Sequence, residues 1–382
     1  MGEVSVQSSI QNEPLIKARM LLFQVFSVHT SPFSNRMLIN FLNQRQGDSM
    51  RIENDRLVNR NLKKRDLKGL EALRCDQRVY CSEPTFKTGD RVIYPNVSYM
   101  AVYRMFHELF NRKFGVETVM VDMTDLEAVK KAITPGTRLV HIETPDNPTN
   151  GVTDIEAIVK IAHENGAVVS VDNTFASPIN QKPLELGADF VVEALTKFIN
   201  GHGDAQGGAI ISNDLETMDR IRYEAQVNVG SVISPFNAWQ IFRGSVTYPL
   251  RMQRINESSQ RIAQWLEERE NVTFVSYPGL PSNPGHELAK RQMKNGYGGV
   301  ISFGVDTDDK TVERFCGALK VVTFAVSLGH DESLIFPQPS YDERINLYPE
   351  KFRKGFIRFS VGLEDPEDII ADLDQALKAV GL

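Results

Sequence analysis

The sequence contains few of the residues that build metal sites and disulfide frameworks. Its 382 residues include 3 cysteines and 7 histidines. The cysteines form no Cys-x-x-Cys pair, and no two histidines stand at the i, i+4 spacing that places two ligands on one helix face. A sparse and odd cysteine count is typical of proteins in a reducing compartment. We therefore expect no metal ion, no disulfide framework and a cytoplasmic protein.

Long apolar runs and an excess of positive charge are also missing. No apolar run approaches the roughly 20 residues of a transmembrane helix. The apolar segment 20–26 is short and lacks a small-residue cleavage site, so we expect no signal peptide. The formal net charge is −6, which argues against nucleic acid or a membrane surface as a partner. The remaining composition is that of a globular protein long enough for two domains.

Strands and helices are predicted to alternate from residue 88 onward. Apolar runs bounded by turn residues predict strands, and apolar residues at helical spacing predict the helices between them. The expected strands cover 91–95, 116–123, 137–145, 167–173, 188–195 and 207–212, and the expected helices cover 99–115, 125–136, 152–166 and 183–187. This order predicts an α/β fold with a mostly parallel central sheet and right-handed crossovers.

A second, smaller unit is expected after a long helical stretch at 234–268, which is interrupted near Gly244 and Pro249. Beyond it, expected strands at 270–280, 298–305, 321–329 and 356–364 and helices at 311–320 and 365–380 indicate an α+β domain. We divide the chain into an atypical N-terminal segment (1–87), a cofactor-binding domain (88–240) and a C-terminal α+β domain (241–382). The charged run 51–74 is expected to be solvated, with a short helix at its end.

Asp172 and Lys197 each follow an apolar run, and together they suggest a cofactor. Both side chains fall at the carboxyl ends of expected parallel strands, where ligands bind in such sheets. An amine can form a Schiff base with the aldehyde of pyridoxal phosphate (PLP), and a carboxylate can keep the pyridine nitrogen protonated, which makes the ring a strong electron sink. The pair predicts a PLP site in which Lys197 is the catalytic, cofactor-holding residue and Asp172 pairs with the ring nitrogen.

The residues around this pair resemble a known enzyme family. Residues 140–204, VHIETPDNPTNGVTDIEAIVKIAHENGAVVSVDNTFASPINQKPLELGADFVVEALTKFINGHGD, are similar to the Cys/Met-metabolism family of PLP enzymes. That family includes cystathionine γ-synthase, cystathionine β- and γ-lyases, methionine γ-lyase and the O-acylhomoserine sulfhydrylases. The resemblance covers roughly residues 88–382. It implies a fold-type I, PLP-dependent transferase-like architecture and a homo-oligomer, because relatives assemble as dimers paired into tetramers.

The resemblance also implies roles for individual residues. Tyr99 matches a catalytic tyrosine that stacks on the PLP ring. Asn147 in ETPDNP matches an asparagine near the cofactor's phenolic oxygen and the substrate carboxylate, and Thr196 matches a hydroxyl that hydrogen-bonds the phosphate. Arg358 in GFIRFSVGLE matches the arginine that clamps the substrate α-carboxylate, for which a planar guanidinium is well suited, and Ser327 lines the same site.

Val326 bears on the choice of substrate. Relatives that cleave cystathionine often carry glutamate here, whereas valine suits an apolar thioether, as in methionine γ-lyases. The cysteine that methionine γ-lyases commonly place two residues after the stacking tyrosine is Ala101 in this chain. The resemblance thus implies a PLP-dependent carbon–sulfur lyase whose expected reaction is α,γ-elimination on methionine or a related γ-substituted amino acid. Cystathionine γ-lyase, cystathionine γ-synthase and O-acylhomoserine sulfhydrylase chemistry remain open alternatives.

Several phosphate contacts of the family are missing from the sequence. Ala194 stands where the family usually has serine, and residues 1–87 contain neither its Tyr-x-Arg motif, which reaches the phosphate across a subunit interface, nor its Ser-Gly-Met turn. Each such contact contributes about 1.5–3 kcal/mol, so we expect weak PLP binding. Three explanations stay open: another phosphate site, a catalytically inactive homologue that serves as a binding or structural subunit, or a mis-assembled N-terminal sequence.

Overall fold

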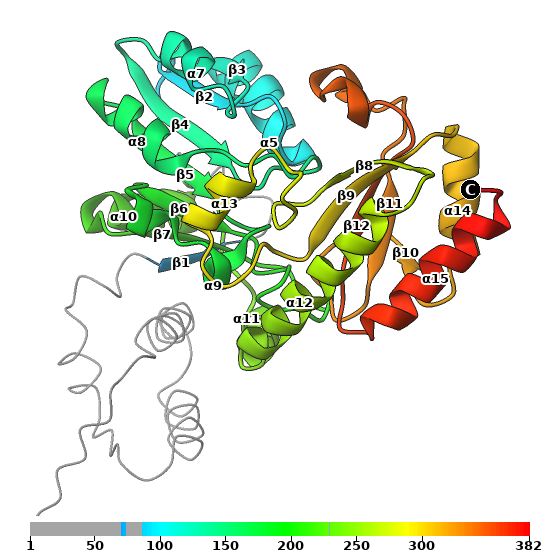
Figure 1. Ribbon diagram of the computed structural model, residues 1–382. Coiled ribbons are helices and arrows are strands. Elements are labelled where there is room, and N and C mark those ends of the chain that lie inside the picture. Colours follow the sequence, from blue (N-terminus) through cyan, green and yellow to red (C-terminus); the bar gives the residue numbers. More distant parts are fainter. Residues whose placement is uncertain (1–69, 74–85, 229) are drawn as a thin grey trace, which may run out of the picture.

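The computed structural model describes residues 70–73, 86–228 and 230–382 of the chain. In this part of the chain, two β-sheets with their own helices lie beside each other (Figure 1). The larger sheet has the strand order β1-β7-β6-β5-β4-β2-β3. Its strands are β1 (Leu70–Leu73), β2 (Arg91–Pro95), β3 (Glu117–Val121), β4 (Thr137–Glu143), β5 (Val168–Asp172), β6 (Phe190–Glu193) and β7 (Gly208–Ser212).

Strands β2 to β6 of the larger sheet run parallel, and β7 and β1 are antiparallel to their neighbours. The expected mostly parallel sheet is therefore confirmed. The expected short helix at the end of the charged run is wrong, because Leu70–Leu73 pairs with β7 along Gly208–Ile211. A four-residue helix is marginal in isolation, so hydrogen bonds to a free sheet edge outweigh a weak helical tendency.

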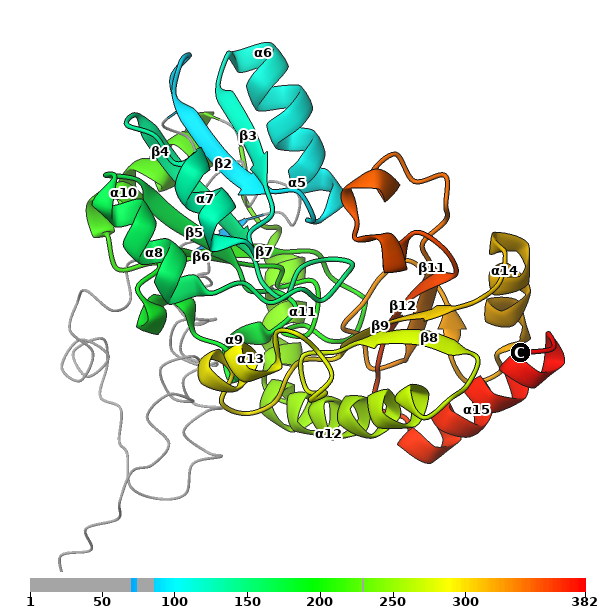
Figure 2. The same ribbon diagram turned by 45° about the horizontal axis from the view of Figure 1, so that its top comes forward.

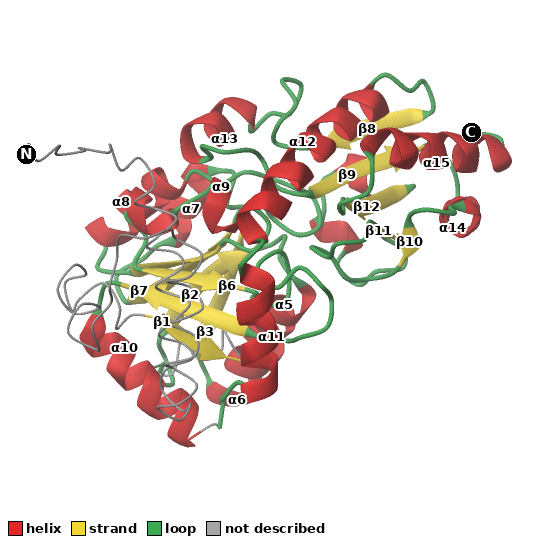
Figure 3. Cartoon of the chain, turned by 90° about the horizontal axis from the view of Figure 1, so that it is seen from below, coloured by secondary structure: helices red, strands yellow, loops and turns green. Residues whose placement is uncertain are grey.

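Helices cover both faces of the larger sheet (Figure 3). Successive side chains of a strand point to opposite faces: Ile93 packs with the helices α7 and α8, whereas Val92 and Tyr94 pack with the helical stretch that starts at α5. The helical elements of this half are α5 (Met100–Arg104), the π-helix η1 (Met105–Asn111), α6 (Arg112–Phe114), α7 (Leu126–Ala132), α8 (Ile155–Glu164), α9 (Ser177–Asn180), the 3₁₀ turn η2 (Pro183–Leu186), α10 (Leu215–Arg222), the π-helix η3 (Tyr223–Asn228) and α11 (Pro235–Ser245).

Local signals set the ends of several of these helices. The Asp125 and Asp154 side chains accept hydrogen bonds from the first backbone N–H groups of α7 and α8, which satisfies donors that have no partner inside the helix. The helical stretch from Met100 ends at Gly115, whose φ of 65° is left-handed and is open to glycine without a Cβ penalty. The expected helices at 99–115, 125–136 and 152–166 are confirmed.

The smaller sheet has the order β10-β11-β12-β9-β8 and is antiparallel except for the β10–β11 pair. Helix α12 lies along it, beside β8 and β9, and packs against α15 (Figure 2). The elements are α12 (Tyr248–Glu267), β8 (Val272–Ser276), α13 (His286–Gln292), β9 (Val300–Val305), α14 (Asp309–Ala318), β10 (Thr323–Phe324), β11 (Leu334–Pro337), the 3₁₀ turns η4 (Ile345–Leu347) and η5 (Glu350–Phe352), β12 (Phe356–Ser360) and α15 (Pro366–Ala379).

One expected strand of the smaller sheet is much shorter than predicted. The run 321–329 forms a strand only at Thr323–Phe324. The chain then turns at Gly329, whose φ of 73° is incompatible with an extended strand. Strand β11, which the sequence did not predict, pairs with β12 in the centre of this sheet, where four residues ending in proline gave too short an apolar pattern.

The loop that follows β4 joins the two sheets. The Asn150 side-chain amide donates to the carbonyl oxygens of Ser276 (3.0 Å) and Val300 (2.9 Å), and the Ser276 hydroxyl donates to the carbonyl of Thr149 (2.8 Å). Asn150 has a positive φ of 59°, which asparagine adopts more readily than most residues. These buried bonds fix the loop 144–151 between the sheets. None of the described helices is both long enough and apolar enough to span a bilayer.

Candidate active site

The carboxyl ends of β4, β5 and β6 bring the predicted cofactor residues together. Because β4 pairs with β5 in parallel, Glu143 lies opposite Asp172 in the register of the sheet. Strand β6 runs parallel beside β5, and the turn that follows it carries Lys197. This common edge results from the parallel topology, and it confirms the expectation that Asp172 and Lys197 lie at strand ends.

Lys197 reaches toward the smaller sheet. Its half-buried side chain donates a hydrogen bond from Nζ to the Ser327 hydroxyl oxygen over 3.1 Å. The turn that contains Ser327 lies directly on the lysine, since a Cβ added to Gly329 would lie 2.7 Å from the backbone nitrogen of Phe198. A substitution at Gly329 would therefore push this turn away from Lys197.

Asp172 is 2% exposed and is held by Thr174. Its Oδ1 accepts hydrogen bonds from the Thr174 backbone N–H (3.0 Å) and hydroxyl. The Thr174 hydroxyl oxygen in turn accepts from the backbone N–H of Ala194 (2.9 Å). These hydrogen bonds connect the ends of β5 and β6 and fix the orientation of the Asp172 carboxylate. A carboxylate that pairs with a cofactor ring nitrogen needs such a fixed orientation.

Glu143 was not among the predicted residues, yet it connects three of them. Its carboxyl oxygens accept from the backbone N–H groups of Tyr99 (2.9 Å) and Asn147 (2.9 Å). Burial, together with the negative charge of Asp172, raises the pKa of Glu143 well above its ordinary value. Its position as the last residue of an apolar strand, just before the TPDNP loop, was the available signal.

Arg358 lies on β12 and faces the same loop. It is 8% exposed. Its Nη1 donates to the side-chain oxygen of Asn147 (3.1 Å), and its Nη2 donates to the carbonyl oxygens of Val326 and Ser327 (3.2 Å for the latter). Burial lowers the pKa of Arg358 to about 10, so it stays a cation at neutral pH. In the part of the chain that the structure describes, its hydrogen-bond partners are carbonyl and amide oxygens, so its charge is available to a bound anion.

The remaining predicted residues differ in their surroundings. The Thr196 hydroxyl donates to the carbonyl of Gly207 (3.1 Å) and accepts from its N–H (3.0 Å). Tyr99 precedes α5 and is 37% exposed. Val326 is 67% exposed, and its carbonyl oxygen accepts a hydrogen bond from Arg358. Among the described residues, hydrogen bonds therefore link Lys197, Ser327, Arg358, Asn147 and, through Glu143, Tyr99, but they do not include the Val326 side chain.

An arginine missed by the sequence interpretation supports the Tyr99 end of this site. The Arg344 guanidinium forms two contacts with the Asp342 carboxylate and donates from Nη1 to the carbonyl of Ser98 (2.9 Å). Arg344 is 5% exposed. It ties the 342–348 segment of the smaller half to the residue before Tyr99. No local sequence pattern reveals a contact between residues so far apart in the chain.

Several sequence expectations fall outside the described residues. They concern the missing Tyr-x-Arg and Ser-Gly-Met motifs, the segment 20–26, and two of the three cysteines, Cys75 and Cys81. The third, Cys316, is buried and free. Among the described residues, no group of His, Cys, Asp or Glu side chains is arranged to hold a metal ion.

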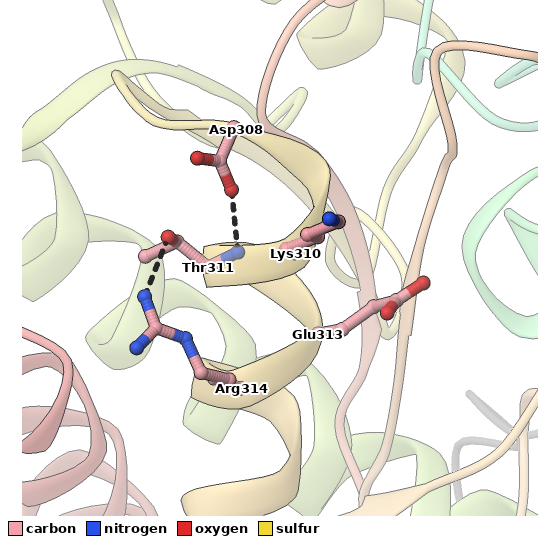
Figure 4. A pocket seen from close by; sticks show the side chains of 5 residues that line it. All are labelled: Asp308, Lys310, Thr311, Glu313 and Arg314. Carbon is pink, nitrogen blue, oxygen red and sulfur yellow. Dashed lines mark hydrogen bonds between the residues drawn. The ribbon is translucent and has the colours of Figure 1, made fainter.

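A separate surface hollow at the start of α14 takes no part in the site. It is lined by Asp308, Lys310, Thr311, Glu313 and Arg314 (Figure 4). Asp308 accepts from the Thr311 N–H (2.8 Å) as the helix cap, and Arg314 donates to the Thr311 hydroxyl (2.9 Å). These contacts identify Asp308 and Thr311 as part of the N-terminal cap of α14.

Fold and site together define a class of protein. A mostly parallel sheet presents a lysine and a buried aspartate at one edge, and a buried arginine from a second sheet faces them. A Schiff-base lysine, a partner for the pyridinium nitrogen and a carboxylate clamp are the groups that PLP chemistry on amino acids requires. The residues present fit PLP at its aldehyde and its ring nitrogen.

Comparison with known proteins agrees with this class. The family model described as Cys/Met metabolism PLP-dependent enzyme matches residues 82–378. The canavanine γ-lyase of Pseudomonas canavaninivorans is 49% identical over 294 residues, which are 76% of this chain and 73% of that protein. The L-methionine γ-lyase of Fusobacterium nucleatum subsp. polymorphum is 41% identical over 301 residues, 77% of this chain and 75% of that protein.

A solved structure extends the likeness to the fold. The cystathionine γ-lyase from Lactobacillus plantarum, complexed with L-serine, superposes with a TM-score of 0.76 at 34% identity and covers 83% of this chain and 86% of its own. The chain belongs to the Cys/Met metabolism family of PLP-dependent enzymes. Its fold is accordingly the fold-type I architecture, and its cofactor is PLP.

Proposed function

We propose that the protein is a PLP-dependent γ-lyase that carries out α,γ-elimination on methionine or a related γ-substituted amino acid, giving a 2-oxo acid, ammonia and the released γ-substituent. The observation that carries this proposal is the continuous set of contacts from Lys197 through Ser327 to Arg358 and Asn147. These contacts support a site in which a cofactor lysine lies beside a substrate carboxylate clamp.

Each residue has a separate task in the proposed reaction. PLP, when bound, supplies the electron sink for the charge released at the substrate carbon atoms. Lys197 holds the cofactor and, once its amine is free, moves protons. Asp172 pairs with the ring nitrogen, and Tyr99 stacks on the ring. Arg358 binds the substrate carboxylate through its planar fork.

The binding set of the proposal includes three further residues. Thr196 contacts the phosphate, Asn147 orients Arg358 through the 3.1 Å bond between them, and Ser327 lines the carboxylate site. Glu143 accepts hydrogen bonds from the backbone N–H groups of Tyr99 and Asn147 and so holds both residues in place. Val326 borders the place of the γ-substituent, where an apolar side chain favours a thioether over a cationic group.

A second substrate is favoured by one specific finding. The relative that is 49% identical over 294 residues is a canavanine γ-lyase. Canavanine also carries its leaving group on the γ-carbon, so the same elimination applies to it. Cystathionine is a third candidate, because a structurally similar relative is a cystathionine γ-lyase.

Turnover assays separate these candidates. The purified protein with added PLP is given methionine, canavanine, cystathionine or O-acylhomoserine with a thiol, and 2-oxo acid and ammonia are measured. We expect 2-oxo acid and ammonia from a γ-substituted substrate. Production of a new thioether without ammonia would instead assign synthase or sulfhydrylase chemistry. No product with any of them, despite bound PLP, would contradict the proposal.

We also propose a homo-oligomer, a tetramer built as a dimer of dimers. Large apolar side chains are exposed along η3, the loop after it and α11, which supports an interface there. They are Tyr223 (60%), Val227 (65%), Val232 (48%), Phe236 (65%) and Trp239 (54%). We further propose a cofactor-binding domain at residues 88–240 and a C-terminal domain at residues 241–382, which the presence of two sheets supports. We also propose a cytoplasmic location, which the small number of cysteines supports.

A further inference from the structure

His330 has no role in the proposed reaction, yet two hydrogen bonds connect it to Lys197. The Ser327 hydroxyl oxygen lies 3.1 Å from Lys197 Nζ and 2.9 Å from His330 Nε2. On the other side of the imidazole, Nδ1 lies 3.9 Å from a carboxyl oxygen of Glu332. The His330 side chain is 14% exposed. A string of lysine, hydroxyl, imidazole and carboxylate therefore runs from the cofactor lysine to the surface.

The backbone around this string is shaped to bring the imidazole close. A Cβ added to Gly203, which has a φ of 65°, would lie 2.7 Å from two atoms of the His330 ring. The turn after Lys197 thus leaves room for the ring only because glycine stands at 203. Gly329 makes the corresponding close approach on the other side of Lys197.

A hydroxyl group has one hydrogen to donate, and this limits the states of the string. When Lys197 is an ammonium, it offers donors only, so the Ser327 oxygen accepts from it. The Ser327 hydrogen can then be donated to His330 if Nε2 is neutral and unprotonated. When His330 is protonated, both ring nitrogens are donors. The Ser327 hydrogen can then be donated to Lys197 only if Lys197 is a neutral amine. If both groups are protonated, the Ser327 oxygen has to accept from two cations whose charges repel each other, which makes this state the least favourable one.

We propose that His330 is a positioning residue that couples its own protonation inversely to that of Lys197 through the Ser327 hydroxyl. The inference deepens the proposed function, because it rests on Lys197 being the lysine that holds the cofactor and moves protons. The string also permits a balanced proton shift. One N–H bond of the Lys197 ammonium breaks, Ser327 exchanges one O–H bond for another, and one N–H bond forms on His330 Nε2.

The charge of Lys197 acts on His330 in the direction of this coupling. The charged groups that influence it are Lys197, Glu332 and Asp331. Burial, followed by the positive charge of Lys197, lowers the pKa of His330, and the two carboxylates oppose this shift. Glu332 faces Nδ1 and favours the tautomer that carries hydrogen there, which leaves Nε2 as the acceptor for Ser327.

The first experiment measures the reactivity of the Lys197 amine without any turnover. The full chain, free of PLP, is labelled with limiting acetic anhydride between about pH 5 and 8, where histidine titrates, and the Lys197 peptide is quantified. In His330→Gln the amide oxygen still accepts from Ser327 but cannot be protonated. At the low end of the range, wild-type Lys197 should be about tenfold more reactive than in His330→Gln, because a positive imidazole about 6 Å away disfavours its ammonium form. At the high end of the pH range, the reactivity of Lys197 should be the same in the wild type and in His330→Gln.

The second experiment uses the reciprocity of such a coupling. In Lys197→Met the positive charge is gone, and the imidazole signal of His330 in an NMR titration should move about one pH unit higher. His202→Gln serves as the control, because His202 is an exposed histidine shortly after Lys197 in the sequence and its Nδ1 lies 2.6 Å from the carbonyl oxygen of Asn200. The labelling of Lys197 and the titration of His330 should both be the same in His202→Gln as in the wild type.

Identical labelling profiles for wild type and His330→Gln, an unmoved His330 titration, or an equal change in His202→Gln would each overturn the coupling. The proposed function fails on a different result. If borohydride reduction attaches the cofactor to another lysine, Lys197 is not the cofactor lysine, whereas the labelling and the titration still report on the coupling.

Discussion

The two sheets contribute to the site in different ways. The larger sheet supplies Asp172, Lys197 and Tyr99 from strand ends and the turns next to them, and its parallel register fixes their positions. The smaller sheet supplies Arg358 from the middle of β12 and Ser327 from the turn after β10. In the proposed function, the first group holds the cofactor and the second binds the substrate carboxylate. Cofactor binding and substrate binding should therefore respond separately to mutation.

The loop 144–151 contacts the residues of both groups. It starts at the carboxyl end of β4, yet its hydrogen bonds from Asn150 go to β8 and β9. Asn147 in the same loop touches both Glu143 and Arg358. A change in this loop is thus expected to affect both functions, whereas a change on either sheet should affect one.

The largest effect is expected at Lys197. In Lys197→Ala the cofactor loses its covalent attachment and the proton carrier is removed, so turnover should fall by several orders of magnitude. Borohydride reduction of the wild type followed by peptide mapping should find the pyridoxyl group on the Lys197 peptide. Lys182→Ala, a surface lysine paired with Glu185 (3.0 Å), is the control and should remain active. A pyridoxyl group on any other lysine would contradict the assignment.

Arg358→Ala tests whether substrate binding can be weakened while cofactor binding is kept. The variant should still attach PLP, as followed by its visible absorption, but lose about 100-fold in kcat/KM, close to 3 kcal/mol, because the substrate carboxylate loses a charged partner. Arg353→Ala, which removes contacts to the carbonyls of Tyr348 and Asn346, is the matched arginine control. Loss of the cofactor in Arg358→Ala would show that the two sheets do not divide the tasks.

The joining loop offers a pH-dependent test at Asp146. Burial is the main cause that raises the pKa of Asp146 to about 7 from its ordinary value of 3.8. The folded protein therefore holds the Asp146 proton more tightly than the unfolded chain does. The contribution of Asp146 to the free energy of unfolding falls as pH rises from about 4 to about 7. Asp146→Asn removes this dependence. The unfolding free energy of the variant relative to wild type should rise by about 2–4 kcal/mol across this range.

Chemical denaturation at several pH values measures this difference. Asp154→Asn is a control that alters another aspartate of the same connection, one that caps α8. This control removes one negative charge from the same connection, so it separates the effect of the Asp146 proton from the effect of a lost charge. Parallel stability curves for Asp146→Asn and the wild type would mean that Asp146 does not hold a proton in the folded state.

The sequence predicted those parts of the site that depend on local pattern. Asp172 and Lys197 could be placed because the ends of parallel strands share one edge of a sheet. The helices expected at 125–136 and 152–166 followed from apolar residues at helical spacing. Each of these inferences needs only a short window of the chain and the general topology of an α/β sheet.

The unpredicted parts depend on contacts between distant segments. Glu143 is identified only when the backbone of Tyr99 is seen to approach it, and Arg344 only when it is seen against Ser98. His330 resembles any polar turn residue until Ser327 is placed between it and Lys197. The exposed side chain of Val326 could not be foreseen either, since the run 321–329 was expected to be one strand.

The smallest effect is expected at Val326, and it would refine the account of the smaller sheet. The side chain is 67% exposed, and the contact with Arg358 comes from the backbone, so Val326→Glu should leave carboxylate binding intact. A glutamate here can meet a distal ammonium group, but an exposed ion pair contributes only about 0–1 kcal/mol. The ratio of kcat/KM for cystathionine to that for methionine should therefore rise by no more than about fivefold. Val321→Glu, at an exposed valine of the same run, is the control and should leave the ratio unchanged. If the wild type already cleaves cystathionine far faster than methionine, Val326 does not set the preference, and selectivity must come from residues nearer to the loop 144–151.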